Sequence, residues 1–222
     1  MCRVCTAVPV TGEPHVTIGA DRGFTFDHVF DLPTPQATVY ADCVHNLVEG
    51  IFDGFNATVL AYGQTGSGKT YSMGTGFETA TVDEEVGIIP RALAHVFNGI
   101  DRRREEAKLE GRVEPVFDVS VQFIELYNEE IIDLLAEDRG TSKGLRIHED
   151  HKGEIYLQGA TAAPVKNAHE EILRKRGEMY RCFIRWLSDR GISRCCCLVS
   201  DSDENAAVLS PGSSDVDALL CD

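Results

Sequence analysis

Residues Gly63-Gln64-Thr65-Gly66-Ser67-Gly68-Lys69-Thr70 decide how the rest of the chain is interpreted. They match the pattern G-x-x-x-x-G-K-[ST] of a phosphate-binding P-loop. The run 57–62 before them is short, apolar and rich in β-formers, and residues 69–73 after them can open a helix. Glycines let the backbone bend so that successive N–H groups point at an anion, and the helix N-terminus adds a positive field. The stretch therefore predicts a nucleotide site, against the alternative of a glycine-rich turn without a ligand.

The residue types in this loop have distinct expected roles. The Lys69 ammonium is expected to reach the β- and γ-phosphates, and the Thr70 hydroxyl to ligate Mg²⁺. The expected nucleotide-binding residues are Gly63, Gln64, Thr65, Gly66, Ser67, Gly68, Lys69 and Thr70, with Thr70 as the metal ligand.

Composition narrows the class of protein. The length of 222 residues suits one domain with a short appendage. A formal net charge of −15 argues against a broad basic surface, so we expect neither nucleic-acid nor lipid binding. No apolar run reaches membrane-spanning length and no signal pattern opens the chain, which favours a cytosolic protein with reduced cysteines. Cys2-x-x-Cys5 has the spacing of metal ligands, but no second pair completes four ligands, so we expect no metal site there.

The periodicity before the P-loop predicts a loop over 1–23, a strand over 24–30 and a helix over 35–54. Thr34 and Pro35 suit the start of that helix. Its expected apolar face holds Tyr40, Val44, Leu47, Val48, Ile51 and Phe55.

After the P-loop, the pattern predicts a loop over 74–87 and a helix from about Ile88 that frays into the charged residues 101–112. Alternation of apolar and polar residues predicts a strand over 117–127. Further expectations are a short helix over 129–135, a hairpin of 145–148 with 154–157 that turns at Gly153, a helix from Asn167 that residues 183–187 extend, and disorder beyond Ser200.

Four segments resemble signatures of the kinesin motor domain. The run from Phe24 to Phe30 is similar to that family's FxFDxVF strand, and Gly54–Gly74 to its GxNATVxAYGQTGSGKTxTMxG. Gly87-Ile88-Ile89-Pro90-Arg91 and the residues from Glu125 to Leu135 look like two more signatures. The resemblance covers about residues 5–181.

This resemblance implies an α/β fold, the P-loop NTPase kinesin-motor fold, with three α-β-α layers around a central mixed sheet that is incomplete in this chain. It implies an ATP hydrolase that moves along microtubules, with ATP and Mg²⁺ as cofactors, tubulin as partner and a place in the cytoplasmic cytoskeleton. Tyr71 resembles the family position beside the adenine. Lys152 resembles part of a secondary tubulin contact, with an exposed turn charge as the alternative. The loop 74–77 leans toward the chromokinesin-like fourth class.

Departures from the family also shape the expectations. The chain starts after the family's R-x-R-P motif, and neither N-x-x-S-S-R-S-H (switch I) nor D-L-A-G-S-E (switch II) occurs in it. We therefore expect a partial motor domain over 1–181, a divergent, disordered tail over 182–222, weak nucleotide binding and no efficient hydrolysis. No catalytic residue is identified, because the remaining acidic candidates are expected on solvated faces: Glu125, Glu129, Glu130 and Asp133.

Folding is expected to suffer as well, because family strands that flank the P-loop strand would be missing. The P-loop strand would then keep unpaired edges, and the helix over 35–54 would expose its apolar stripe. Two rival functions stay open. One is a P-loop kinase or NTPase of another family, but this needs an apolar strand ending in Asp (Walker B), which we do not find. The other is a non-catalytic product that binds nucleotide or tubulin weakly. The sequence contains no heptad run, so it gives no indication of the oligomeric state.

Overall fold

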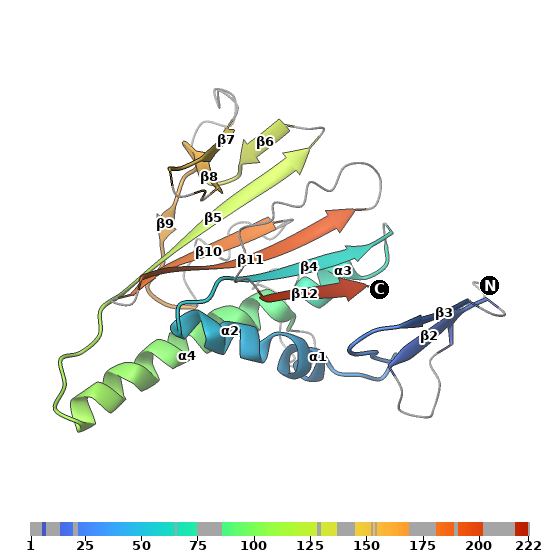
Figure 1. Ribbon diagram of the computed structural model, residues 1–222, viewed down its shortest axis with the longest axis horizontal. Helices are drawn as coiled ribbons and strands as arrows, with labels where there is room; N and C mark the ends of the chain where they lie inside the picture. The colour runs from blue at the N-terminus through green and yellow to red at the C-terminus, as the bar shows by residue number, and fades with distance from the viewer. Residues whose placement is uncertain are drawn as a thin grey trace.

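The computed structural model describes residues 6–7, 14–19, 22–64, 66–74, 86–127, 130–136, 145–151, 153, 155–168, 181–188, 191–201 and 216–221. Seven strands form its main sheet: β4 (Ala57–Gly63), β5 (Phe117–Tyr127), β6 (Glu130–Asp133), β9 (Ala163–Pro164), β10 (Arg181–Ser188), β11 (Gly191–Asp201) and β12 (Val216–Cys221). Their order is β12-β4-β11-β10-β5-β6, with β9 beside β5. The sheet is mixed, because β4 runs parallel to β11 and β12 while the other pairs are antiparallel (Figure 1).

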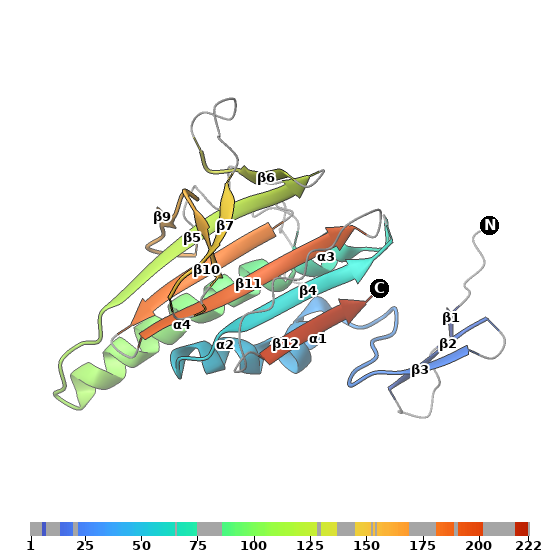
Figure 2. The same cartoon turned by 45° about the horizontal axis from the view of Figure 1, so that its top comes forward.

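Four helices accompany this sheet: α1 (Gln36–Cys43), α2 (His45–Phe52), α3 (Lys69–Met73) and α4 (Ile88–Leu109). Within the described ranges they all lie on one face of the sheet (Figure 2). The mixed sheet agrees with the expected fold class. A helical layer on the opposite face, which a three-layer arrangement includes, is not among the described residues.

The core fills the space between the helices and the sheet. The apolar residues of α2 and α4 meet those of β4 and β5 there, and each side chain in the following list is at most 3% exposed: Val44, Val48, Ile51, Ala57, Val59, Ala61, Met73, Ile88, Ile89, Ala92, Leu93, Val96, Ile100, Val121 and Phe123. Burial of this many aliphatic groups is the main favourable contribution to folding.

The described residues also form two smaller sheets. The strands β1 (Thr6–Ala7), β2 (His15–Ile18) and β3 (Arg22–Thr25) form an antiparallel sheet that lies apart from the main one in both views (Figures 1 and 2). The hairpin of β7 (Arg146–Glu149) and β8 (Ile155–Gln158) confirms the expectation for that segment. Gly153, at φ +83°, supplies the left-handed turn residue that the hairpin needs.

Both edges of β4 are paired, contrary to the expectation of an incomplete sheet around it. Ala57–Gly63 pairs with residues 195–201 of β11 on one side, and Ala57–Tyr62 with β12 on the other. The apolar stripe of the preceding helices is also covered rather than exposed: Tyr40, Val44, Leu47, Val48 and Ile51 are all buried, and only Phe55 of the expected face is exposed. The partners come from the segment 182–222, where we expected disorder.

Four expectations for the first half of the chain were wrong in detail. Residues 6–7 and 15–18 are strands and not loop, and the strand expected over 24–30 spans Arg22–Thr25 instead. The helix expected over 35–54 is two helices, broken where Val44 adopts φ −119° and ψ −31°. The helix α4 does not fray at Asp101 but continues to Leu109, and within it Arg102 and Arg103 pair with Glu49 of α2.

The strands β4 and β5 and the helix α3 confirm the predicted elements, whereas the described residues of the segment 129–135 do not form the expected short helix. Residues Glu130–Asp133 are the strand β6, which pairs with 124–127 of β5. The β-branched Ile131 and Ile132 suit a strand, and the ladder gives their backbone groups partners, so tertiary pairing overrides the local helical pattern. Asp133 is not solvated as expected: it is 4% exposed and accepts hydrogen bonds from the N–H groups of Leu135 (2.9 Å) and Thr161 (2.7 Å).

The segment after Arg181 also differs from expectation. Residues 183–187, expected to extend a helix, belong to the strand β10, and β12 contradicts disorder over 216–221. The helix expected from Asn167 falls mostly outside the described residues. The division into a motor part over 1–181 and a tail over 182–222 stays a prediction. Within the described ranges, no helix has both the length and the apolar character needed to cross a bilayer.

Candidate nucleotide-binding site

The loop between β4 and α3 has the backbone shape that its glycines predict. Gly66 (φ +82°) and Gly68 (φ +105°) both adopt left-handed conformations that other residues rarely reach. The Ser67 N–H donates to the Gln64 carbonyl at 3.1 Å, which closes the turn, and α3 starts directly after Gly68. The loop therefore turns from the end of a buried strand into a helix N-terminus, the arrangement in which backbone N–H groups bind anions.

Lys69 is held inside this loop. Its side chain is buried, with the residue 4% exposed, and its Nζ donates to the carbonyl oxygens of Gly63 and Gln64, at 2.8 Å each. A buried ammonium needs such acceptors, because an uncompensated charge in the interior is costly. The loop thus concentrates positive charge at its centre.

Two further observations fit a phosphate group in this loop. The buried Oγ of Ser67 has no hydrogen-bond partner within the described part of the chain, so it has unused capacity for a ligand oxygen. Thr70 and Tyr71 are exposed at the start of α3, the latter at 54%, and are accessible to a ligand. The residues expected to hold nucleotide and Mg²⁺ therefore lie together, except Thr65, which lies outside the described residues.

Gln36 connects this site to the helical layer. The residue is 5% exposed, and its Nε2 donates to the Tyr71 carbonyl at 2.8 Å. Tyr71 lies in the last turn of α3, where carbonyl groups lack partners within the helix. The sequence analysis missed this role, because a single Gln at the start of a helix carries no recognisable pattern.

The carboxyl ends of β4, β11 and β12 lie at the same edge of the sheet, next to α3 (Figure 1). Ligands of α/β proteins bind at such an edge. The register pairs Asp201, the last residue of β11, with Gly63, the first residue of the P-loop. An apolar strand that ends in Asp beside the P-loop strand is the arrangement we did not find in the sequence. The run of three cysteines and Ser200 before Asp201 obscured it.

Other residues singled out from the sequence do not join the site. Lys152 and Cys2-x-x-Cys5 lie outside the described residues. Glu130 is exposed on β6, and Asp133 has a structural role in holding Leu135 and Thr161.

Comparison with known families decides the identity of this fold. A family model for the kinesin motor domain matches residues 8–185. This chain belongs to the kinesin motor domain family. Kinesins are a family of microtubule motors, so the sheet, the P-loop and the helices α1–α4 are parts of a kinesin-motor P-loop NTPase fold.

The kinesin relatives agree with this assignment. Kinesin-like protein klp-12 from Caenorhabditis elegans is 55% identical over 169 residues, a match that covers 75% of this chain and 10% of klp-12. Kinesin-like protein KIF21B from Mus musculus is 52% identical over 187 residues, covering 81% of this chain and 11% of KIF21B. The chain thus spans about a tenth of the length of the curated relatives it matches.

A solved kinesin structure has the same architecture. Drosophila Kin10/NOD, crystallised with divalent manganese and ADP, superposes with a TM-score of 0.69 and 26% identity, covering 90% of this chain and 67% of NOD. NOD has also been docked together with bovine tubulin into a map of its microtubule complex.

Proposed function

We propose that this chain is the nucleotide-binding part of a kinesin-type motor, which binds ATP with Mg²⁺ in the loop Gly63–Thr70 and contacts tubulin on the microtubule. The observation that carries the proposal is the loop between β4 and α3, in which left-handed glycines surround the buried Lys69 ammonium. NOD binds ADP and manganese and has been docked with tubulin, which supports the same ligand classes here.

Each residue of the loop has a role in this proposal. The backbone N–H groups of Gly66, Ser67 and Gly68 and the Lys69 ammonium bind phosphate oxygens, in exchange for the two carbonyls that Lys69 now contacts. The Thr70 hydroxyl ligates Mg²⁺, which would neutralise phosphate charge. Tyr71 lies beside the adenine. Gly63, Gln64 and Thr65 complete the turn.

Motility along microtubules, and a location in the cytoplasmic cytoskeleton, are proposed for the whole protein. For this chain we propose slow hydrolysis, because phosphoryl transfer requires a positioned water and a γ-phosphate sensor in addition to a P-loop. Both switch motifs that supply these parts in kinesins are absent from the sequence. The same absence favours the second candidate function, a non-catalytic product that binds nucleotide or tubulin weakly without movement.

Equilibrium binding of a fluorescent ATP analogue to the full chain, with and without Mg²⁺, tests the proposal. We expect Mg²⁺-dependent binding that falls at least tenfold in Lys69→Met, while Lys108→Met, on an exposed part of α4, binds like the unaltered chain. Circular dichroism verifies that both variants are folded. A folded chain that ignores ATP and Mg²⁺ would refute the nucleotide site.

Co-sedimentation with microtubules separates the two candidate functions. A motor part is expected to pellet with microtubules more strongly in a non-hydrolysable ATP analogue than in ADP, and to show tubulin-stimulated ATP turnover. Binding that ignores the nucleotide, without turnover, favours the non-catalytic product.

A further inference from the structure

A second cluster of side chains with ligand chemistry lies on the helical layer, between α2 and α4. His45 and Glu49 are four residues apart on α2 and so share one face of that helix. His95 of α4 lies opposite them, and its ring stacks on that of His45 with centroids 4.6 Å apart. One ligand atom from each of the three residues lies within 4.8 Å of the others. None of these residues belongs to the P-loop.

The donor set determines which ions this cluster suits. Two imidazoles and one carboxylate are ligands for Zn²⁺ and neighbouring transition metals, whereas Mg²⁺ and Ca²⁺ prefer oxygen alone. Ligand atoms about 2.0–2.2 Å from a tetrahedral Zn²⁺ are roughly 3.3–3.5 Å apart. To reach that geometry, ligand atoms up to 4.8 Å apart close by at most about 1.5 Å, and the 2.8 Å contact between His95 Nε2 and Glu49 Oε1 opens by about 0.5–0.7 Å. His45 is exposed on the first turn of α2, where its ring can rotate.

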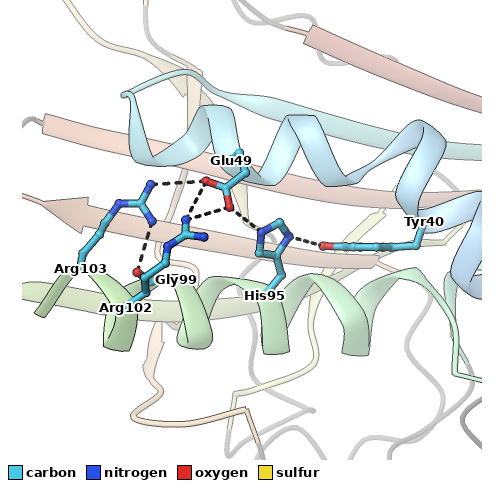
Figure 3. Close-up of polar contacts among 6 residues, drawn as sticks. All are labelled: Tyr40, Glu49, His95, Gly99, Arg102 and Arg103. Carbon is cyan, nitrogen blue, oxygen red and sulfur yellow. Dashed lines mark hydrogen bonds and ion pairs between the residues drawn. The ribbon is translucent and has the colours of Figure 1, made fainter. Parts of the chain in front are cut away.

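Tyr40 orients the His95 ring for such a role. The Oη of this buried tyrosine lies 2.9 Å from His95 Nδ1, while His95 Nε2 lies 2.8 Å from Glu49 Oε1 (Figure 3). A metal-ligating histidine usually has a partner of this kind on its second ring nitrogen, which fixes the tautomer. On metal binding at Nε2, the ring proton moves to Nδ1 and Tyr40 Oη accepts it as a hydrogen bond.

Two arginines of α4 also contact the Glu49 carboxylate. Arg102 contacts both carboxylate oxygens, at 3.0 and 3.2 Å, and Arg103 contacts Oε2 at 3.4 Å (Figure 3). Oε2 thus keeps two arginine contacts when Oε1 faces a metal.

We propose that His45, Glu49 and His95 form a binding site for a divalent transition metal, Zn²⁺ by its ligand preference, with Tyr40 as the residue that positions His95. The metal links α2 to α4 and has one position left for water. The positive charges of the two arginines repel the metal ion. Solvent screens the repulsion from Arg102, because its side chain is 53% exposed.

Titration of the full chain with Co²⁺, a coloured stand-in for Zn²⁺, tests this site. The background is Cys2→Ser with Cys5→Ser, which removes the only Cys-x-x-Cys pair near the N-terminus. We expect visible absorption of a four-coordinate Co²⁺ without the near-ultraviolet band of thiolate ligation, and displacement by Zn²⁺. His45→Ala and His95→Ala lower the affinity at least tenfold, and Tyr40→Phe about tenfold. His151→Ala, an exposed histidine at the β7–β8 turn, leaves it unchanged.

The direction in which one substitution changes the Co²⁺ affinity distinguishes a metal site from a purely structural ion-pair cluster. Arg102→Gln removes a positive charge next to Glu49 and is expected to tighten Co²⁺ binding severalfold, while Arg104→Gln, whose side chain lies near Phe117, does not. The proposal is overturned if the full chain shows no visible Co²⁺ spectrum, or if the spectrum survives His45→Ala unchanged. The second result stays decisive even if His95→Ala does not fold, because His45 is exposed.

Discussion

The backbones of Gly74 and Gly87 lie in contact, so that a Cβ on Gly87 would sit 2.4 Å from the Gly74 Cα. Gly74 follows α3 and Gly87 precedes α4, and this approach joins the helix that starts in the P-loop to the longest of the described helices. Only a residue without a side chain fits at position 87.

Gly87→Ala is therefore expected to destabilise the protein by about 1–3 kcal/mol, because the added methyl group forces two backbones apart. The melting temperature measures this effect. Gly50→Ala is the matched control: its Cβ would meet only the Phe55 side chain at 3.9 Å, within a helix, so its stability is expected to be unchanged or higher. Equal melting temperatures of the two variants would contradict the contact.

Removal of the Gln36 donor is expected to loosen the end of α3. Gln36→Leu keeps the size of the side chain but deletes the N–H group that binds the Tyr71 carbonyl, at a cost of about 1 kcal/mol in stability. Nucleotide affinity should fall severalfold, as α3 carries Lys69 and Thr70. Gln158→Leu, at an exposed position on β8, is the control for both measurements. An unchanged nucleotide affinity in Gln36→Leu would show that Gln36 does not support the P-loop.

The register of β11 leads to a prediction for Asp201. Its place beside Gly63 is suited to a carboxylate that binds Mg²⁺ through water, so Asp201→Asn is expected to weaken Mg²⁺-dependent nucleotide binding about tenfold and to leave Mg²⁺-independent binding unchanged. Asp217 pairs with Thr58 near the other end of β4, so Asp217→Asn serves as the matched control. Equal Mg²⁺ dependence in both variants would remove Asp201 from the site.

Acid is expected to abolish the stabilisation that Glu49 provides. Its pKa falls from 4.5 to about 2 on folding, so its contribution is complete above pH 4.5 and is lost as the pH falls toward 2. With solvent screening of a side chain that is 30% exposed, we expect Glu49→Gln to cost about 1 kcal/mol at neutral pH. Urea unfolding at several pH values measures the free energy of unfolding, and the difference between Glu49→Gln and the unaltered chain should vanish near pH 2. Glu106→Gln, exposed on α4, should show no such trend.

The sequence predicts the P-loop unit well because the information there is local. The strand predicted over 57–62, the turn glycines and the helix opening at Lys69 follow from neighbouring residues alone, and so does the turn at Gly153. The same holds for β5, in which alternating residues Val119, Val121 and Phe123 face the core.

Elements that depend on distant partners were not predictable in this way. The residues 130–133 fit a helix by pattern and become a strand because β5 offers a ladder. Strand pairing places Asp201 beside Gly63, and a hydrogen bond joins Gln36 to Tyr71, and both pairs are far apart in the sequence. The break at Val44 lacks the glycine or proline that marks a helix end.

The pairing of β4 has a consequence for how the protein is made. Both strands that flank it, β11 and β12, leave the ribosome long after the P-loop itself. During translation the nascent chain therefore presents β4 with two bare edges, which are templates for pairing with other chains. The sheet around β4 can therefore close only after residues 191–201 and 216–221 have also left the ribosome.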